Sequence, residues 1–147
     1  MKIYLDNSFL NRPFDEPSLG WNRLEADALF LILERIKKNQ FHLVGSPVIG
    51  YENSFNPAPE RKKFVDEIMK MSTAHINLDE AIRRRAMNIQ KASKLHALDA
   101  LHVACAEAAG VDFFITCDYA VIKRCQGHIK VVSPLEFIHE YEKYHPA

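Results

Sequence analysis

The chain has 147 residues, of which 48% are hydrophobic and 26% are charged, and its 19 Lys and Arg residues balance its 19 Asp and Glu residues. This length suits one domain with a core of its own, and the composition is that of a globular protein, which excludes the disordered and fibrous classes. A formal charge of zero argues against strong non-specific binding to nucleic acid, which needs clustered cations, although it leaves room for a local basic rim.

Cysteine usage and the N-terminus predict the compartment. The three cysteines are an odd number without paired spacing, which is typical of free thiols in a reducing environment. The N-terminal apolar run stops at Asp6, unlike a signal peptide, and no stretch is long and apolar enough to span a bilayer. We therefore expect a cytoplasmic protein with no membrane partner.

The N-terminal part begins with a short β-prone strand, residues 3–5, which stops at Asp6. A proline-rich loop follows over residues 11–20. From about Trp21 to Lys38 the spacing predicts a helix. Its expected apolar stripe comprises Leu24, Ala28, Leu29, Leu31, Ile32, Leu33 and Ile36.

A second strand, residues 41–44, precedes a helix with a clear start signal. Ser46 is typical of an N-cap, and Pro47 suits the first helical position. Glu52 falls four residues after Val48, at the border of the apolar face, so we expect its side chain to point inward or along an edge.

The remaining elements alternate between helices and strands. In chain order they are a helix from Pro59 through Met69, a minor strand or extended link at 74–78, a helix capped by Asp79 and running to about Lys94, an apolar helix at 96–106 closed by Gly110, a strand at 113–116, a short helix at 119–124, a strand at 129–132 and a terminal helix from Pro134. This alternation, with short apolar strands, predicts a single α/β domain in which helices cover both faces of a central parallel sheet, a three-layer α/β/α sandwich.

Four acidic residues from separate elements should meet at one edge of this sheet. Asp6 and Asp118 each follow a strand, Asp99 lies in the first turn of the apolar helix, and Glu52 lies one turn further into its own helix. Carboxylates that share a crevice repel one another unless a cation neutralises them, and Mg²⁺ favours such oxygen ligands. The pattern predicts a site for metal-assisted phosphodiester hydrolysis.

Each acid also has a purely structural explanation. Asp6 and Asp118 are common cap or turn residues, and Glu52 could bond to solvent or a lysine. Asp99 could complement the helix dipole, yet it stands among Ala, Leu and Val, where an ionised acid without a partner is unfavourable. Considered together on one edge, the four acids favour a functional site.

The chain resembles the PIN-domain family of metal-dependent nucleases, which includes VapC-type toxins. The resemblance lies in the strand ending at Asp6, the Ser46 helix that carries Glu52, the Ala-rich helix around Asp99, and the sequence Thr116-Cys117-Asp118 at a strand end. These motifs agree with the family in order and spacing over nearly the whole chain, which implies that residues 1–147 form a single PIN-like domain.

The resemblance implies that Asp6, Glu52, Asp99 and Asp118 are the catalytic residues and bind Mg²⁺ or Mn²⁺, with Ser8 and Thr116 as supporting residues. It also implies an RNA substrate, and a toxin role would add an antitoxin protein as partner. Val121 stands where some members carry another acid, so the number of metal ions, one or two, stays open. Aromatic residues such as Tyr119 and Tyr141 could belong to a homodimer surface or to the core.

Further basic residues stand outside this group of acids. Arg12, close to Asp6 in sequence, is the candidate for phosphate contact. His102, one turn after Asp99, could contact it, but a packed histidine is the commoner case. The runs 61–63 and 83–85 are expected to be solvated faces; either could touch RNA phosphates, but neither forms a clear basic stripe.

Two rival functions remain open at the level of sequence. A catalytically inactive binding or scaffold domain would agree with the neutral charge and with Val121. A phosphotransfer enzyme with Asp6 as nucleophile, as in haloacid-dehalogenase-like enzymes, typically needs a second Asp at the position of Ser8, so it ranks last.

Overall fold

The structure, a computed structural model, describes residues 1–125 and 128–144. Its described part contains a five-stranded sheet in the order β3-β2-β1-β4-β5, in which all neighbouring strands are parallel. The strands are β1 (Lys2–Leu5), β2 (His42–Gly45), β3 (Ala74–His75), β4 (Phe113–Ile115) and β5 (Lys130–Val132).

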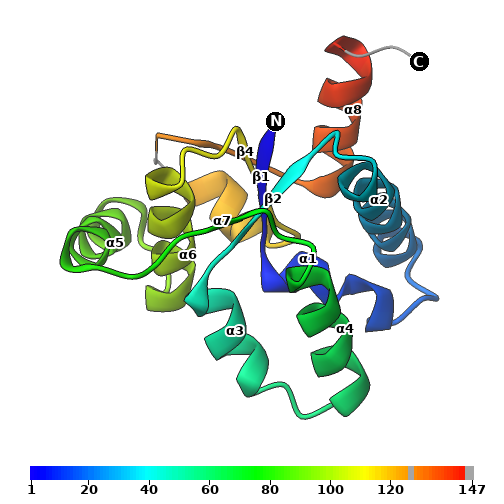
Figure 1. Ribbon diagram of the computed structural model, residues 1–147, viewed down its shortest axis with the longest axis horizontal. Helices are drawn as coiled ribbons and strands as arrows, with labels where there is room; N and C mark the ends of the chain where they lie inside the picture. Colours follow the sequence, from blue (N-terminus) through cyan, green and yellow to red (C-terminus); the bar gives the residue numbers. More distant parts are fainter. Residues whose placement is uncertain (126–127, 145–147) are drawn as a thin grey trace.

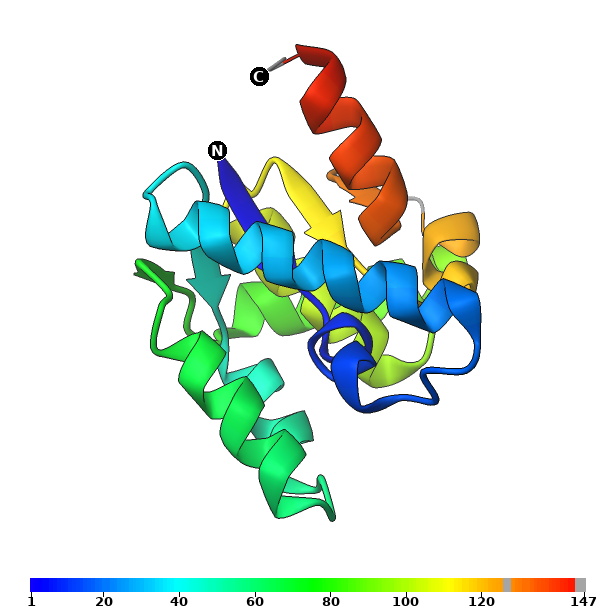
Figure 2. The same ribbon diagram turned by 90° about the vertical axis from the view of Figure 1, so that its right-hand side faces the viewer.

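Helices connect the strands and cover the sheet. They are α1 (Asn7–Leu10), the 3₁₀ helix η1 (Arg12–Phe14), α2 (Gly20–Lys37), α3 (Pro47–Ser54), α4 (Pro59–Met69), α5 (Glu80–Ser93), α6 (Ala97–Ala108), α7 (Tyr119–Arg124) and α8 (Pro134–Tyr144). α2 and α8 lie on one side of the sheet and α5 and α6 on the other, as Figures 1 and 2 show. This arrangement confirms the predicted α/β/α sandwich with a parallel sheet.

The central strand β1 is covered on both faces, which explains its continuous apolar sequence. Ile3, Tyr4 and Leu5 are all fully buried. The register pairs Leu5 with Ile115, so β1 and β4 end side by side. The residues that directly follow these two strands therefore meet at the same edge of the sheet, where α3 and α4 also lie (Figure 1).

Helix boundaries follow from local signals. The Ser46 hydroxyl accepts a hydrogen bond from the Ile49 N–H, and the Asp79 carboxylate accepts one from Ile82, as the predicted N-caps require. Beyond α6, Gly110 has a φ of +68°, a backbone conformation that favours glycine. The short link at 74–78 contributes β3, a two-residue strand beside β2.

Two predictions for the N-terminal part differ from the structure. The loop at 11–20 contains η1, because Pro13 suits the first turn of a helix. In α2 the predicted stripe was wrong at one edge, since Leu24 is 50% exposed whereas Glu25 is fully buried. The Glu25 side chain faces inward because its carboxylate forms an ion pair with Arg12 of η1.

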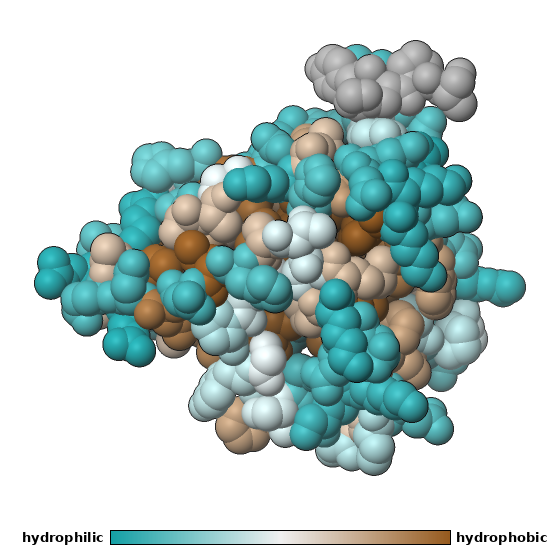
Figure 3. Space-filling view, in the orientation of Figure 1, coloured by the Kyte–Doolittle hydropathy of each residue, from teal (hydrophilic) through white to brown (hydrophobic). Residues whose placement is uncertain are grey.

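The described residues contain no helix that could cross a membrane. The face of the molecule seen in Figure 3 is hydrophilic around most of its edge, with apolar areas toward its middle and over α5 and α6.

Candidate functional site

Asp6 is held at the end of β1 by two hydroxyl groups. It is 5% exposed, and its Oδ2 accepts hydrogen bonds from Thr116 Oγ1 at 2.7 Å and from Ser8 Oγ at 3.1 Å. Its backbone N–H donates to the Ile115 carbonyl at 3.0 Å, which extends the β1–β4 ladder. Oδ1 accepts no hydrogen bond from residues that the structure describes, so this oxygen remains available to a ligand.

Asp118 begins α7 on the neighbouring strand end. Its Oδ1 accepts a hydrogen bond from the Ala120 N–H at 2.9 Å, so it is an N-cap as well as a cavity residue. The Asp118 N–H donates to Thr116 Oγ1 at 3.0 Å. Thr116 therefore fixes the side chain of Asp6 and the backbone of Asp118 together.

Asp99 lies in the first turn of α6, as predicted from sequence. Burial, together with the negative charges of Asp6 and Asp118, raises the pKa of Asp99 from 3.8 to about 6. Burial is the larger cause of this shift, and the charges of Asp6 and Asp118 add to it because these acids lie near Asp99.

Glu52 reaches the same space from α3. Its Oε1 lies 2.8 Å from Nε2 of His102, and Nδ1 of His102 lies 2.6 Å from the Tyr4 hydroxyl. His102 is fully buried, whereas the Glu52 side chain is 36% exposed. Burial alone would lower the pKa of His102, but the hydrogen bond to Glu52 and the charge of Asp6 outweigh it and raise that pKa.

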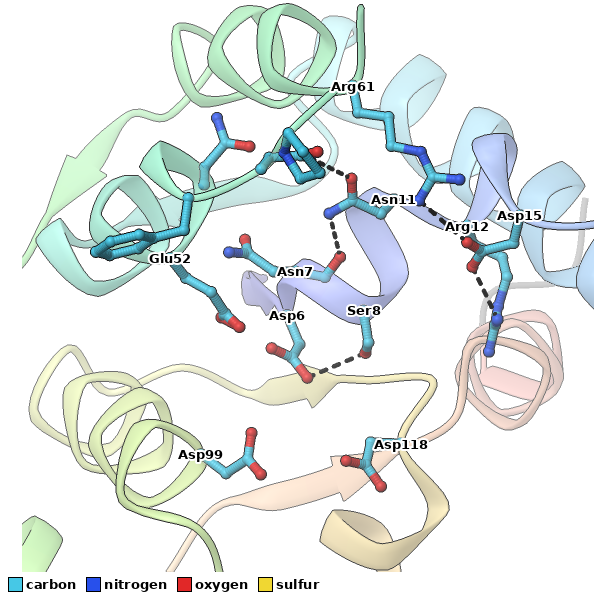
Figure 4. A pocket seen from close by; sticks show the side chains of 14 residues that line it. Asp6, Asn7, Ser8, Asn11, Arg12, Asp15, Glu52, Arg61, Asp99 and Asp118 are labelled. Carbon is cyan, nitrogen blue, oxygen red and sulfur yellow. Dashed lines mark hydrogen bonds and ion pairs between the residues drawn. The ribbon is translucent and has the colours of Figure 1, made fainter. Parts of the chain in front are cut away.

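The four acids line one cavity of about 460 Å³. Figure 4 shows that the side chains of Asp6, Glu52, Asp99 and Asp118 all point into this space, from four different elements. Five carboxylates and two guanidinium groups line the cavity, so its charge is strongly negative although the whole chain is neutral.

Two arginines form the opposite wall of the cavity. Arg12 Nη1 and Arg61 Nη1 donate to the two carboxylate oxygens of Asp15, at 2.9 and 3.3 Å. Arg12 Nε also lies 3.1 Å from Oε1 of the buried Glu25. Both arginines are thus held at the rim of the acidic cavity by fixed anionic partners.

The structure brings all the predicted site residues into one region, but not equally closely. Within the described residues, the tightest group of metal-ligating side chains is Asp6, Glu52 and His102, whose ligand atoms lie within 4.8 Å of one another. Asp99 and Asp118 line the same cavity but are not part of this group. Ser8 and Thr116 both bond to Asp6.

Two residues of this region have contacts that the sequence did not predict. The expectation of a packed His102 is confirmed by its full burial, but its bond to Glu52 was not predicted; its place one turn after Asp99 was the available signal. Arg61 was expected on a solvated face, with an RNA phosphate contact as the alternative, and it lines the cavity because it donates to the Phe14 carbonyl in η1 and to Asp15 just beyond it.

A family model described as PIN domain matches residues 3–126. Two solved structures share the fold. One is the crystal structure of VapBC2 from Rickettsia felis bound to a DNA fragment from their promoter. A chain of that structure aligns with this protein with a TM-score of 0.58 and 12% identity, and the alignment covers 90% of this protein and 98% of that chain. PAE2754 from Pyrobaculum aerophilum aligns with a TM-score of 0.55 and 10% identity, covering 97% and 99%. No curated protein matches the sequence.

Proposed function

Because the chain belongs to the PIN domain family, whose members are typically metal-dependent nucleases, we propose that it is a Mg²⁺- or Mn²⁺-dependent endoribonuclease. The observation that carries this proposal is the convergence of Asp6, Glu52, Asp99 and Asp118 on one cavity. Each acid comes from a different element, so no local helix or turn requirement explains why they meet.

The chemistry of the residues present fits a hard divalent cation. The cavity offers carboxylate oxygens, the donors that Mg²⁺ and Mn²⁺ prefer. Asp6 Oδ1 accepts no hydrogen bond from the described residues. Burial first, and then the charges of Asp6 and Asp118, raise the pKa of Asp99, and a bound cation would offset the contribution of these charges. We assign Asp6, Glu52, Asp99 and Asp118 as the residues that would hold the ion.

The protein's own groups would orient the reaction. Thr116 and Ser8 fix Asp6 through Oδ2, which directs Oδ1 toward the cavity. A bound ion at this position would activate a water molecule and stabilise negative charge on the leaving oxygen. The carboxylates would hold the ion from the positions in which they already line the cavity.

The basic wall supports a phosphodiester as substrate. Arg12 and Arg61 stand across the cavity from the acids, where a nucleic-acid phosphate that neighbours the scissile one could replace part of their contact with Asp15. Planar guanidinium groups suit such bidentate phosphate contacts. We therefore keep Arg12 as a phosphate contact and add Arg61 beside it.

The choice of RNA, and a role as the toxin of a toxin–antitoxin pair, rest on likeness to relatives. The family membership and the fold shared with a chain of the VapBC2 structure support them. An antitoxin protein is then the proposed partner. Growth arrest on expression, relieved by co-expression of the product of a small adjacent upstream reading frame, would support the toxin role.

A catalytically inactive scaffold is the second candidate. The observation in its favour is Val121, which is 1% exposed and apolar where some family members carry a further acid. A scaffold needs no cation, so millimolar Mg²⁺ or Mn²⁺ would leave its melting temperature unchanged, whereas a binding site would raise it.

Cleavage assays test the proposal directly. Labelled single-stranded RNA and DNA are incubated with the protein, with Mn²⁺ or with EDTA. We expect Mn²⁺-dependent internal cleavage of RNA that Asp6→Asn abolishes and that Asp27→Asn, at an exposed acid of α2, retains. Cleavage that persists in Asp6→Asn or in EDTA would refute it.

A further inference from the structure

A buried chain of polar groups runs beneath the acidic cavity. The Tyr4 hydroxyl lies 2.6 Å from Ser46 Oγ and 2.6 Å from His102 Nδ1, and His102 Nε2 lies 2.8 Å from Glu52 Oε1. Tyr4 and His102 are both fully buried. This series of hydrogen-bonded groups joins β1, the N-cap of α3 and the middle of α6, and it ends at a carboxylate of the proposed active site.

The hydrogen atoms in this chain can be assigned from the donors and acceptors. Ser46 Oγ accepts the Ile49 N–H, so its own hydrogen is free to point to Tyr4 Oη. The Tyr4 hydrogen then points to Nδ1 of His102, which makes Nδ1 an acceptor and leaves the ring proton on Nε2. Each of these hydrogen-bonded groups has a donor or acceptor partner in this assignment.

The opposite tautomer does not fit. A bare Nε2 would place its lone pair 2.8 Å from a carboxylate oxygen, and two acceptors at that distance repel each other. A doubly protonated ring would also donate from Nε2. Nε2 therefore donates a hydrogen bond to Glu52 whether the ring is neutral or doubly protonated.

We infer that His102 is a positioning residue, whose Nε2–H holds Glu52 in place for the cation and which is not itself a metal ligand. This inference rests on the proposed function. The proximity of Asp6, Glu52 and His102 would also allow a three-ligand site, but Nε2 could ligate only after losing its proton and its bond to Glu52. Asp6 Oδ1, at 3.9 Å from Nε2, is too far to replace that bond.

Positioning by His102 matters for Glu52 because Glu52 lacks the local anchors that Asp6 and Asp118 have. Its side chain is 36% exposed and long, so it would sample several rotamers without an anchor. Asp6 has anchors in Thr116 and Ser8, and Asp118 is held by its N-cap bond. His102 provides the corresponding anchor for Glu52 from within the core.

Nitrogen NMR of the histidine side chains decides the hydrogen-bond assignment. Spectra of ¹⁵N-labelled protein are recorded without metal and with Mg²⁺, and the His102 signals are identified by their loss in His102→Gln. We expect a protonated Nε2 in both spectra. A deprotonated Nε2 in the metal-free protein, or loss of the Nε2 proton on adding Mg²⁺, overturns the inference.

Matched variants separate positioning from packing. His102→Leu removes the donor, and His102→Gln keeps an N–H near the position of Nε2. We expect calorimetric Mn²⁺ affinity to fall ~10-fold or more in His102→Leu and to recover in large part in His102→Gln. His42→Gln, at an exposed histidine of β2, should match the parent protein.

Equal losses in the Leu and Gln variants, or no loss in either, overturn the positioning role. If the parent protein binds no Mn²⁺ at all, the proposed function fails and a metal-positioning role fails with it, whereas the metal-free spectrum still decides whether Nε2 donates to Glu52. The two failures are thus distinguishable.

Discussion

Thr116 Oγ1 donates a hydrogen bond of 2.7 Å to Asp6 Oδ2, across two neighbouring strands whose sequences are 110 residues apart. The same oxygen accepts the Asp118 N–H at 3.0 Å. One fully buried hydroxyl thus links two of the four acids, so the geometry of the cavity depends on the ends of β1 and β4 staying in register.

Thr116→Val should destabilise the protein because it keeps the shape of the side chain but removes this hydroxyl. The Asp6 carboxylate loses its shortest hydrogen bond, and the Asp118 N–H loses its acceptor. We expect a loss of about 1–3 kcal/mol in the free energy of unfolding, measured by urea denaturation. Thr116→Ser, which retains the hydroxyl, is the control and should lose much less; equal stability of the valine variant and the parent would contradict the account.

Asp99→Asn should separate stability from activity. Without metal, the substitution removes a carboxylate whose pKa is raised by burial and by Asp6 and Asp118. The pKa shift, converted to free energy and reduced for solvent screening, predicts that the metal-free variant is more stable by about 1–2 kcal/mol. We also expect the variant to show no metal-dependent cleavage. Asp27→Asn serves as the control for both measurements. A less stable metal-free Asp99→Asn protein would argue against a shared acidic space.

The stability of the metal-free protein should depend on pH through Asp99. Its folded-state pKa, about 6, lies above the ordinary value of 3.8, so between these pH values the folded protein holds a proton that the unfolded chain has released. The contribution of Asp99 is therefore fully favourable below pH 4, declines as the pH rises toward 6 and then levels off. The free energy of unfolding of the parent and of Asp99→Asn is measured by urea denaturation at several pH values. The difference between the two proteins isolates this effect. A pH-independent difference would contradict it.

The Arg12–Glu25 ion pair should show strong coupling in a double-mutant cycle. Glu25 is fully buried and Arg12 Nε lies 3.1 Å from its Oε1, so Arg12→Met leaves a buried carboxylate without its counter-charge. We expect Arg12→Met to lower the free energy of unfolding by about 3 kcal/mol, and the double variant with Glu25→Leu to recover most of that loss. Additive effects in urea denaturation would show that the pair is not coupled.

The sequence predicted the layered fold because its signals are local. Short apolar strands, N-caps such as Ser46 and Asp79, and the glycine after α6 all act within a few residues, and the structure has each of them. The apolar stripe of α2 was wrong at Leu24 because hydrophobic periodicity cannot anticipate that a glutamate one residue later is buried with an arginine from η1.

The site was predictable only to the extent that parallel-sheet topology places strand ends together. Asp6 and Asp118 follow adjacent strands, and that rule brings them to one edge. The bond from His102 to Glu52 depends instead on how α6 packs against α3, and the contacts of Arg61 depend on how α4 packs against η1, so both join segments that are distant in sequence. The resemblance thus implied Ser8 and Thr116, which hold Asp6, whereas the histidine that bonds to Glu52 comes from a separate helix and was not anticipated in that role.

Anomalous diffraction from a crystal soaked in Mn²⁺ tests most directly whether four separate acids make one cation site. We predict an anomalous peak in the cavity, within ligand distance of Asp6 and of at least one more carboxylate among Glu52, Asp99 and Asp118, and no such peak in Asp6→Asn. A parent crystal with no Mn²⁺ peak in the cavity, or an equal peak in the variant, would contradict the account.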